Sequence, residues 1–453
     1  MIANALISRS ASAALSLLLS LASLAAQEVE EKAIDTNPPD SKVREFANIN
    51  PQDQVPTVRA IVPMDGANVF FLNHRGQIGV AKFSPGLSQI GWQLYSDVKL
   101  NALPFIALGP KYSVVTASQT EVTQSFDTNR DVSLDFFQAL VTDWPGRNEG
   151  VNITAGPVAD ANGRLLFALA PFATTAGEPA KARIVAWHPG AKGLVTVTES
   201  ELQIDTFAVN RTGLLAARLQ MPDYRDGYFL SLTDLPPFSA TAPDEAPAVM
   251  PVTRPSLVIP ADLTGKSPPT QICFSHEEGR EKILLTCPAS KRLIEVIPEH
   301  SGAFWTGSFL LRAKLDTSVE TLVEMTPGVI LGGGDNGFIP LTDGKEVFRI
   351  LRIALAADGI VLDFNQPVDR SMASLKETYA VKALSGAGNN SIDIQEIVIE
   401  SDGRTLVLKT GEAPVGSVIR VSCEALTSEK GETLLSPEAF YTVSPAPAPA
   451  PAE

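Results

Sequence analysis

The chain has 453 residues, with 36 Lys or Arg against 51 Asp or Glu, and a formal net charge of −15. This acidity, without any basic run of five or more residues, excludes a surface built to neutralise nucleic-acid phosphates. Apolar residues make up 44% of the chain, which is enough for a sizeable core. The length allows about two or three domains.

Residues 1–25 have the pattern of a signal peptide. Arg9 is the only early charge, and 11–26 is an unbroken run of Ala, Ser and Leu. Small residues near its end suit cleavage after Ala25 or Ala26, whereas an uncleaved membrane anchor is the alternative. No later segment is apolar enough to span a bilayer, so we expect an exported protein of the periplasm, the cell surface or the extracellular space. Residues 26–54 are polar and contain Pro, which predicts a linker.

From 55 to 345 the chain repeats a strand, a polar turn that usually ends in Gly, and another strand. The clearest copies are 69–81, 156–170, 207–219, 272–287 and 328–341, with a degenerate copy at 104–118. Repeated hairpins of this kind are typical of a β-propeller. The expected fold is all-β, with a six-bladed and alternatively seven-bladed propeller. The Pro-rich stretch 234–271 is interpreted as a surface excursion between blades.

Two cysteines flank one of these hairpin turns. If the register is symmetric about the turn at 278–279, Cys273 and Cys287 face each other, and export would allow a disulfide between them. The closed loop of about 15 residues would then stabilise the fold by roughly 3 kcal/mol. Two buried free thiols are the alternative. Cys423 is left unpaired, and we expect it in the core.

Residues 346–443 have a different pattern of strands. Six apolar or alternating segments follow one another at spacings typical of a β-sandwich. They are 348–355, 359–364, 378–384, 394–399, 405–410 and 417–422. The tail 444–453 is a Pro-Ala sequence that predicts an extended end without a fold.

The same region resembles the bacterial Ig-like domain of surface-layer proteins. That family has a Phe-x-x-Pro corner followed by Asp, then a tyrosine strand and a hairpin with Asp-Gly-Arg. The matching residues here are Phe364, Pro367, Asp369, Tyr379 and the triplet 402–404. The resemblance implies an Ig-like sandwich that acts as a spacer or docking module.

Segments 117–135 and 146–169 resemble large secreted dehydrogenase-like propellers of planctomycete and verrucomicrobial bacteria, which are distantly related to quinoprotein sugar and sorbosone dehydrogenases. The resemblance implies a calcium loop, here reduced to Asp127, Asn129, Asp131 and Asp135. Val132 stands where the family has the Gly that permits the sharp turn. Calcium is therefore the candidate metal, and a solvated acidic loop is the alternative.

Oxidation of an alcohol by a quinone needs a general base, usually His. No His lies near Asn148 and Glu149, where the family tends to have one. The four histidines of the chain are interpreted as exposed loop residues: His74, His188, His276 and His300. Pyrroloquinoline quinone is therefore not expected as a cofactor.

The glycines at 332, 334 and 337 satisfy the spacing of a dinucleotide-binding loop. A strand containing Pro340 follows them, where such a site needs a helix. We interpret them as the tight turn of the last blade.

Two functions follow from these patterns. The first is a non-catalytic binding or scaffolding protein with a carbohydrate or protein ligand at the propeller mouth. The alternative is a quinoprotein-type sugar or alcohol dehydrogenase, or an accessory subunit of one. No catalytic or cofactor-binding residue is assigned from the sequence.

Overall fold

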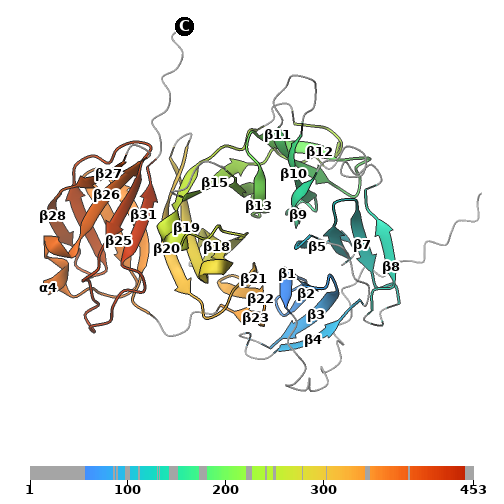
Figure 1. The fold of residues 1–453 in the computed structure, drawn as a ribbon, viewed down its shortest axis with the longest axis horizontal. Coiled ribbons are helices and arrows are strands. Elements are labelled where there is room, and N and C mark those ends of the chain that lie inside the picture. The colour runs from blue at the N-terminus through green and yellow to red at the C-terminus, as the bar shows by residue number, and fades with distance from the viewer. Residues whose placement is uncertain are drawn as a thin grey trace, which may run out of the picture.

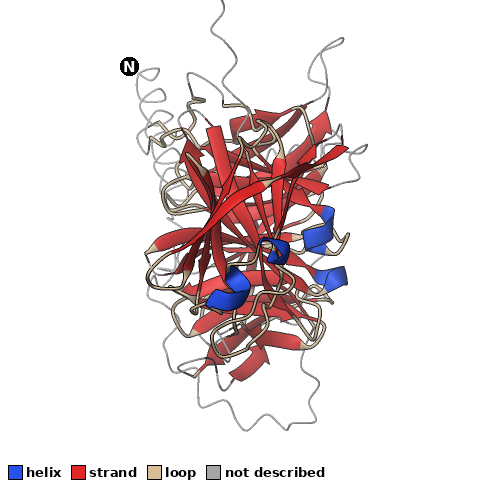
Figure 2. Cartoon of the chain, turned by 90° about the vertical axis from the view of Figure 1, so that its left-hand side faces the viewer, coloured by secondary structure: helices blue, strands red, loops and turns tan. Residues whose placement is uncertain are grey.

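A computed structural model describes residues 57–443 with internal gaps. The gaps are 85–86, 88–89, 97–102, 111–112, 130, 132, 142–151, 173–180, 221–226, 240–241, 248–250, 278, 302–303, 342–346 and 386–387. The expected signal peptide 1–25, the linker 26–54 and the tail 444–453 lie outside the described residues. Nearly all the regular structure is strand, as predicted, and the few helical turns are short (Figure 2).

The described part of 58–340 forms six antiparallel sheets in chain order. Sheet 1 contains β1 (Val58–Pro63), β2 (Asn68–Asn73), β3 (Ile78–Phe83) and β4 (Ile90–Leu94). Sheet 2 contains β5 (Ile106–Leu108), β6 (Val114–Ala117), β7 (Val122–Phe126) and β8 (Phe136–Ala139). Sheet 3 contains β9 (Ile153–Ala159), β10 (Leu165–Phe172), β11 (Lys181–Trp187) and β12 (Val195–Ser200).

The remaining sheets continue this order. Sheet 4 contains β13 (Ile204–Val209), β14 (Leu214–Leu219), β15 (Gly227–Asp234) and β16 (Leu257–Pro260). Sheet 5 begins with β17 (Gln271–Glu277), β18 (Arg280–Cys287), β19 (Arg292–Ser301) and β20 (Phe304–Lys314). Sheet 6 has three strands, β21 (Thr321–Thr326), β22 (Val329–Gly334) and β23 (Gly337–Pro340).

The six sheets are arranged as a ring (Figure 1). The first strand of each sheet is innermost and contacts the first strands of the two neighbouring sheets, and β21 of the last sheet contacts β1 of the first. A radial repeat of small antiparallel sheets about a central axis is the arrangement of a β-propeller. All six hairpins expected from the sequence are present in it.

The hairpin turns follow from their polar residues. In the β13–β14 turn, Asn210 Oδ1 accepts hydrogen bonds from the backbone N–H groups of Thr212 (2.9 Å) and Leu214 (2.7 Å). Gly213 follows with a φ of 92°, a conformation that other residues rarely adopt. The amide side chain and the glycine therefore fix this turn and the register of the strands that it joins.

Each sheet is apolar on both faces and is covered by its neighbours. In sheet 1, Phe71 belongs to a core shared with Leu331 of sheet 6, whereas the adjacent Phe70 belongs to a core shared with Ile106 of sheet 2. Because successive residues of a strand face opposite sides, this alternation makes every sheet depend on two others. Closure of the ring is the arrangement that buries both faces of all the sheets.

The C-terminal part consists of two sheets packed over one core. Its first sheet, the C-terminal sheet, has the order β24 (Ile350–Ala356), β25 (Gly359–Phe364), β29 (Thr405–Thr410) and β28 (Ile394–Ile399). The opposing strands are β26 (Ala380–Ser385), β27 (Gly388–Ile392), β30 (Val418–Ser422) and β31 (Glu438–Thr442). The two layers enclose a core that includes Phe348, Phe364 and Tyr441. The sequence did not predict β27 or β31.

The ring and the C-terminal part share a sheet. Strand β20 pairs with β31 in antiparallel register, so sheet 5 continues through β31, β30, β26 and β27 and has eight strands. Phe309 of β20 pairs with Phe440 of β31, and both belong to a core that also holds Ile259 of sheet 4. The two parts on either side of the expected boundary at 345–346 are therefore joined by the backbone hydrogen bonds between β20 and β31.

The expected disulfide is contradicted. Cys273, Cys287 and Cys423 are all free and buried. In the β17–β18 ladder, Cys273 is paired with Leu284, so Cys287 lies three positions further along β18 and its side chain faces the other side of the sheet. Burial raises the pKa of Cys273 and of Cys287 to about 12, so both stay as neutral thiols.

The Pro-rich stretch 234–271 is more than a surface excursion. It contains β16, the outer strand of sheet 4, and the short helix α3 (Ala261–Thr264). Val252 lies in the segment between β15 and β16, and it forms a parallel bridge with Glu199 of sheet 3. Among the described residues, no helix is both long and apolar enough to cross a membrane.

Candidate functional site

A cavity of about 400 Å³ lies at the axis of the ring. The first strands of all six sheets contribute to its lining, so the ring closure described above is what builds it (Figure 1). Half-buried apolar side chains provide much of the wall. They include Val62, Phe105, Val158, Val209 and Val323.

We call this cavity the channel. The charged side chains of its lining lie near the C-terminal ends of the first strands. His276 at the end of β17 lies between two carboxylates: its Nδ1 is 3.1 Å from Glu324 Oε2 and its Nε2 is 3.3 Å from Glu281 Oε2. The backbone N–H of His276 also donates to Glu324 Oε1 at 2.6 Å. Both ring nitrogens are thus engaged.

The His276 contacts extend over three sheets. Glu324 on β21 of sheet 6 also accepts from Ser275 Oγ (3.1 Å) and from the Gly328 N–H (3.1 Å). On the other side, Asn210 of sheet 4 donates through Nδ2 to both oxygens of Glu281, at 2.7 and 2.8 Å. The chain of contacts therefore ties sheets 4, 5 and 6 together at the rim of the channel, which is a structural role.

Sequence reasoning missed this cluster. It interpreted His276 as an exposed loop residue, whereas the side chain belongs to β17 and is 38% exposed. His300 is exposed as expected, but it lies within β19 and not in a loop, and its ring packs 4.8 Å from that of Trp305. The available signal was Glu324, a charged residue inside the otherwise apolar stretch 322–325.

A separate group of charges lies on the face of sheet 5 that is directed to sheet 6. Glu277 contacts Lys282 (2.9 Å) and Arg312 (2.9 Å), and both cations also reach Glu295, at 3.3 and 3.0 Å. Burial alone would raise the pKa of Glu277, but the hydrogen bond from Lys282 and the charge of Arg312 hold it below its ordinary value. These groups stabilise the contact between neighbouring sheets and do not face the channel.

The side chains of the expected calcium loop form hydrogen bonds with other residues of the protein, most of them in the same loop. Asp135 accepts from the Thr128 N–H (3.0 Å), Asn129 and Asp131 bond each other, and Asp127 accepts from the hydroxyl of Tyr95 at 3.1 Å. Among the described residues, no group of three or more His, Cys, Asp or Glu side chains is placed to hold a metal ion. Calcium binding by this loop, between β7 and β8, therefore stays a prediction.

The channel also fails to fit pyrroloquinoline quinone. This cofactor carries three carboxylates, and a buried carboxylate needs a paired cation or several donors. Of the described residues that line the channel, Arg211 is the one permanent cation, and the lining also contains the carboxylate of Glu324. The chemistry of the wall is therefore unsuited to a trianion.

A further hollow lies outside the ring, near His188. It has a volume of about 240 Å³ and is lined by Trp187, His188 and the Pro-rich residues 236–239. The Phe238 ring contacts that of His188 (4.7 Å between centroids), and the Arg164 guanidinium lies 5.1 Å from the centre of the same ring. Phe238 thus packs the segment that follows β15 against sheet 3.

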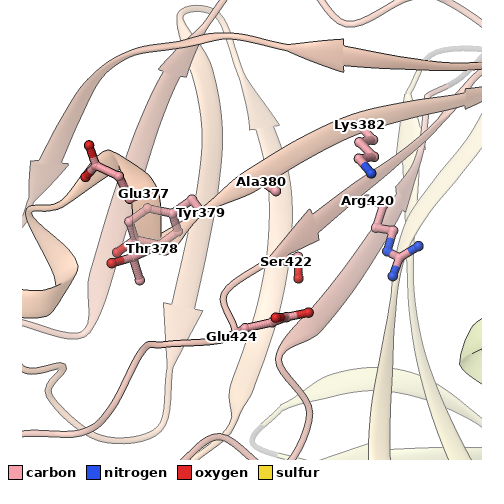
Figure 3. Close-up of a pocket in the computed structure, with 8 residues that line it drawn as sticks. All are labelled: Glu377, Thr378, Tyr379, Ala380, Lys382, Arg420, Ser422 and Glu424. Atoms are coloured by element: carbon pink, nitrogen blue, oxygen red, sulfur yellow. The ribbon is translucent and has the colours of Figure 1, made fainter.

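A shallow groove of about 230 Å³ lies on the C-terminal part (Figure 3). It follows the outer side of β26 and β30, where Lys382 is paired directly with Arg420. Glu377 and Glu424 lie toward the other end, so the groove has charges of both signs. Arg420 is already paired with Glu438, and it lies 3.6 Å from Asp262 of α3. The groove is therefore lined by the C-terminal part, and Arg420 at one end of it also contacts the ring.

No family model matches the chain, and no curated protein matches it. Solved structures with a similar fold include a putative glucose dehydrogenase-type oxidoreductase from Thermus thermophilus (12% identity, TM-score 0.40, 65% of this chain and 94% of that one). Others are the PQQ domain of pyranose dehydrogenase from Coprinopsis cinerea (10%, 0.39, 63% and 91%) and a gluconolactonase from Xanthomonas campestris (11%, 0.42, 63% and 86%). These likenesses are too weak to assign an activity.

Proposed function

We propose that the chain is an exported, non-catalytic binding protein. In this proposal the six sheets are the blades of a six-bladed propeller, residues 1–25 are a cleaved signal, and 346–443 are an Ig-like spacer. The observation that carries it is the channel, which has apolar walls. Among the described residues of its lining, the one histidine is His276, and each of its ring nitrogens lies beside a carboxylate oxygen. A general base needs a ring nitrogen that faces the substrate, whereas those of His276 face Glu324 and Glu281.

The wall chemistry favours a protein ligand over a carbohydrate. A sugar presents hydroxyl groups that each need a partner when they are buried, whereas Val62, Val158 and Val323 provide none. An apolar side chain or short apolar segment of a partner would be covered on all sides by the first strands. The polar rim at Asn210 and Arg211 would remain in contact with the flanking polar residues of such a ligand.

The Ig-like assignment of the C-terminal part rests on its corner. The Asp369 carboxylate caps α4 (Arg370–Ala373) by accepting from the N–H of Ser371 at 2.8 Å. The hydroxyl of buried Tyr379 donates to the carbonyl of Ala373 at 2.9 Å. Both residues thus fix the connection between β25 and β26, as their place in the resemblance implies.

Binding in the channel is tested with the full chain and the dye 8-anilinonaphthalene-1-sulfonate, a monoanion whose aromatic rings fluoresce on apolar surfaces. Ala159 is exposed and lies in the channel lining, so Ala159→Trp narrows the channel without disturbing a core. We expect this variant to lose most of the fluorescence gain. Ala356→Trp, at an exposed position on β24, is the matched control and should keep it.

The dehydrogenase alternative is tested separately. We expect pyrroloquinoline quinone with calcium to leave the melting temperature of the parent chain unchanged, because the channel lacks paired cations. A rise of several degrees would mean that the native state binds the cofactor, and it would overturn the non-catalytic proposal.

A further inference from the structure

The hollow near His188, outside the ring, contains a buried cation. Arg164 stands just before β10, and its side chain is only 6% exposed. Its Nε donates to Asp160 Oδ2 at 2.6 Å, and Asp160 Oδ1 accepts from the backbone N–H of Arg164 at 2.9 Å. These two contacts hold the guanidinium in one orientation and use one of its five N–H donors.

The other nitrogens of this guanidinium have no acceptor in the protein. Among the described residues, none accepts a hydrogen bond from Nη1 or Nη2 of Arg164. Neither nitrogen is wholly covered by protein, and Arg164 lines the hollow, so both can be reached from it. A charged donor that is buried without an acceptor costs free energy. The two Nη atoms therefore point to a ligand that supplies oxygen acceptors.

The walls of the hollow suit a flat apolar body. Sheet 3 contributes Trp187 and Val195, and the segment that follows β15 contributes three prolines, all of them half-buried: Pro236, Pro243 and Pro247. An aromatic ring packs well against the flat surface of an indole. The volume of about 240 Å³ lies below that of drug-sized pockets, which begin at about 300 Å³, so the ligand is a small molecule.

The charges around the hollow limit the charge of the ligand. Asp160 balances part of the charge of Arg164, and a second carboxylate, that of Glu245, lies in the lining. A dianion would be repelled by both carboxylates. A single carboxylate on the ligand can instead accept two parallel hydrogen bonds from the Nη atoms of Arg164.

We propose that this hollow is a second binding site, distinct from the channel, which takes a small aromatic monocarboxylate. The carboxylate of the ligand accepts from Nη1 and Nη2 of Arg164, and its ring lies against Trp187 and the prolines. The Phe238 ring, whose centre is 5.1 Å from the guanidinium, also lines the hollow and extends the apolar wall to its charged end.

Fluorine NMR of the full chain with para-fluorophenylacetate tests the proposal. We expect saturable binding with a Kd of about 1 mM or tighter. The neutral para-fluorophenylacetamide should bind at least about tenfold more weakly, because it lacks the carboxylate. No saturable binding of the acid, which would mean that only water occupies the hollow, would overturn the proposal, and so would equal binding of the acid and the amide.

The role of the guanidinium is tested by Arg164→Lys. This substitution keeps a cation beside Asp160 but removes the planar fork, so we expect it to weaken binding of para-fluorophenylacetate by about tenfold or more. The melting temperature of the variant shows whether the fold is kept. An unchanged Kd in the folded variant would contradict the role of Arg164.

Tryptophan substitutions locate the ligand without changing Arg164. Ala246 is exposed and lines the hollow, so Ala246→Trp narrows it without disturbing a core and should abolish binding of para-fluorophenylacetate. Ala356→Trp on β24 is the matched control and should keep it. Ala159→Trp, which narrows the channel, should also keep it. Binding that survives Ala246→Trp, or that is lost in Ala159→Trp, would refute the assignment to this hollow.

Discussion

Single side chains in this molecule act mostly by joining one sheet to the next. His276, Glu281 and Asn210 link sheets 4 and 5 at the channel rim, and Glu324 extends the link to sheet 6. Such contacts join residues far apart in the sequence, so no local pattern could predict them. The sequence placed His276 beside a hairpin turn, but no local pattern indicated that Glu324 of another sheet contacts it.

The Glu277 contacts predict a pH dependence of stability. Its pKa is lowered in the folded protein, so the stabilisation is present at neutral pH, above the unfolded-state pKa, and is lost as the pH falls through the folded pKa. Glu277→Gln should cost about 1–2 kcal/mol at pH 7. It should also reduce the loss of unfolding free energy between pH 7 and acid, measured by urea denaturation.

The matched control is Glu396→Gln. Glu396 contacts Lys409 at 2.8 Å, but its side chain is 60% exposed, so water screens the pair. We expect little change in stability at any pH. An equal effect of the two substitutions would contradict a special role for the buried charges.

At the scale of the strand, the sequence predicted where many strands lie, but it did not predict the register in which neighbouring strands pair. The segments 359–364, 394–399 and 405–410 coincide with β25, β28 and β29 because each is a short segment rich in apolar and β-branched residues. The sequence of β27, Gly388–Ile392, has no such pattern and went unseen. For Cys273, the partner on β18 is Leu284 and not Cys287, and this difference of three positions puts the two cysteines on opposite faces of the sheet.

The glycines of β22 show why their spacing resembles a ligand-binding loop. A Cβ added to Gly334 would lie 2.1 Å from the carbonyl oxygen of Ser318, so the position is reserved for close packing of the backbone. Gly334→Ala should destabilise the fold by about 1–3 kcal/mol in denaturant unfolding. Gly411→Ala, where a new Cβ meets nothing within 4 Å, should be within about 0.5 kcal/mol of the parent.

At the scale of the whole molecule, the sequence predicted the ring and the sandwich but presented them as separate bodies. The strand that joins them, β31, pairs with both β20 and β30. A pairing between residues 309 and 440 leaves no local trace in either segment. The shared sheet means that the two parts should unfold together.

Phe440→Ala tests this coupling. Phe440 is fully buried in the core that contains Ile259 and Phe309 of the ring, so its truncation should cost about 3–5 kcal/mol and speed amide exchange in β16 and β18. Phe364→Ala removes an equal side chain from the core of the sandwich. Exchange in β16 and β18 should rise less in this control. Equal rates in the two variants would contradict coupling through β31.

The position of β31 also bears on how the chain is made. Synthesis proceeds from the N-terminus, and the strand that pairs with the edge of β20 (Phe304–Lys314) is Glu438–Thr442, more than a hundred residues later in the chain. Until those residues leave the ribosome, β20 exposes an unpaired edge and Phe309 lacks its partner. The sheet therefore stays incomplete until residues 438–442 have been synthesised, and a product that stops before residue 438 has an open, aggregation-prone edge.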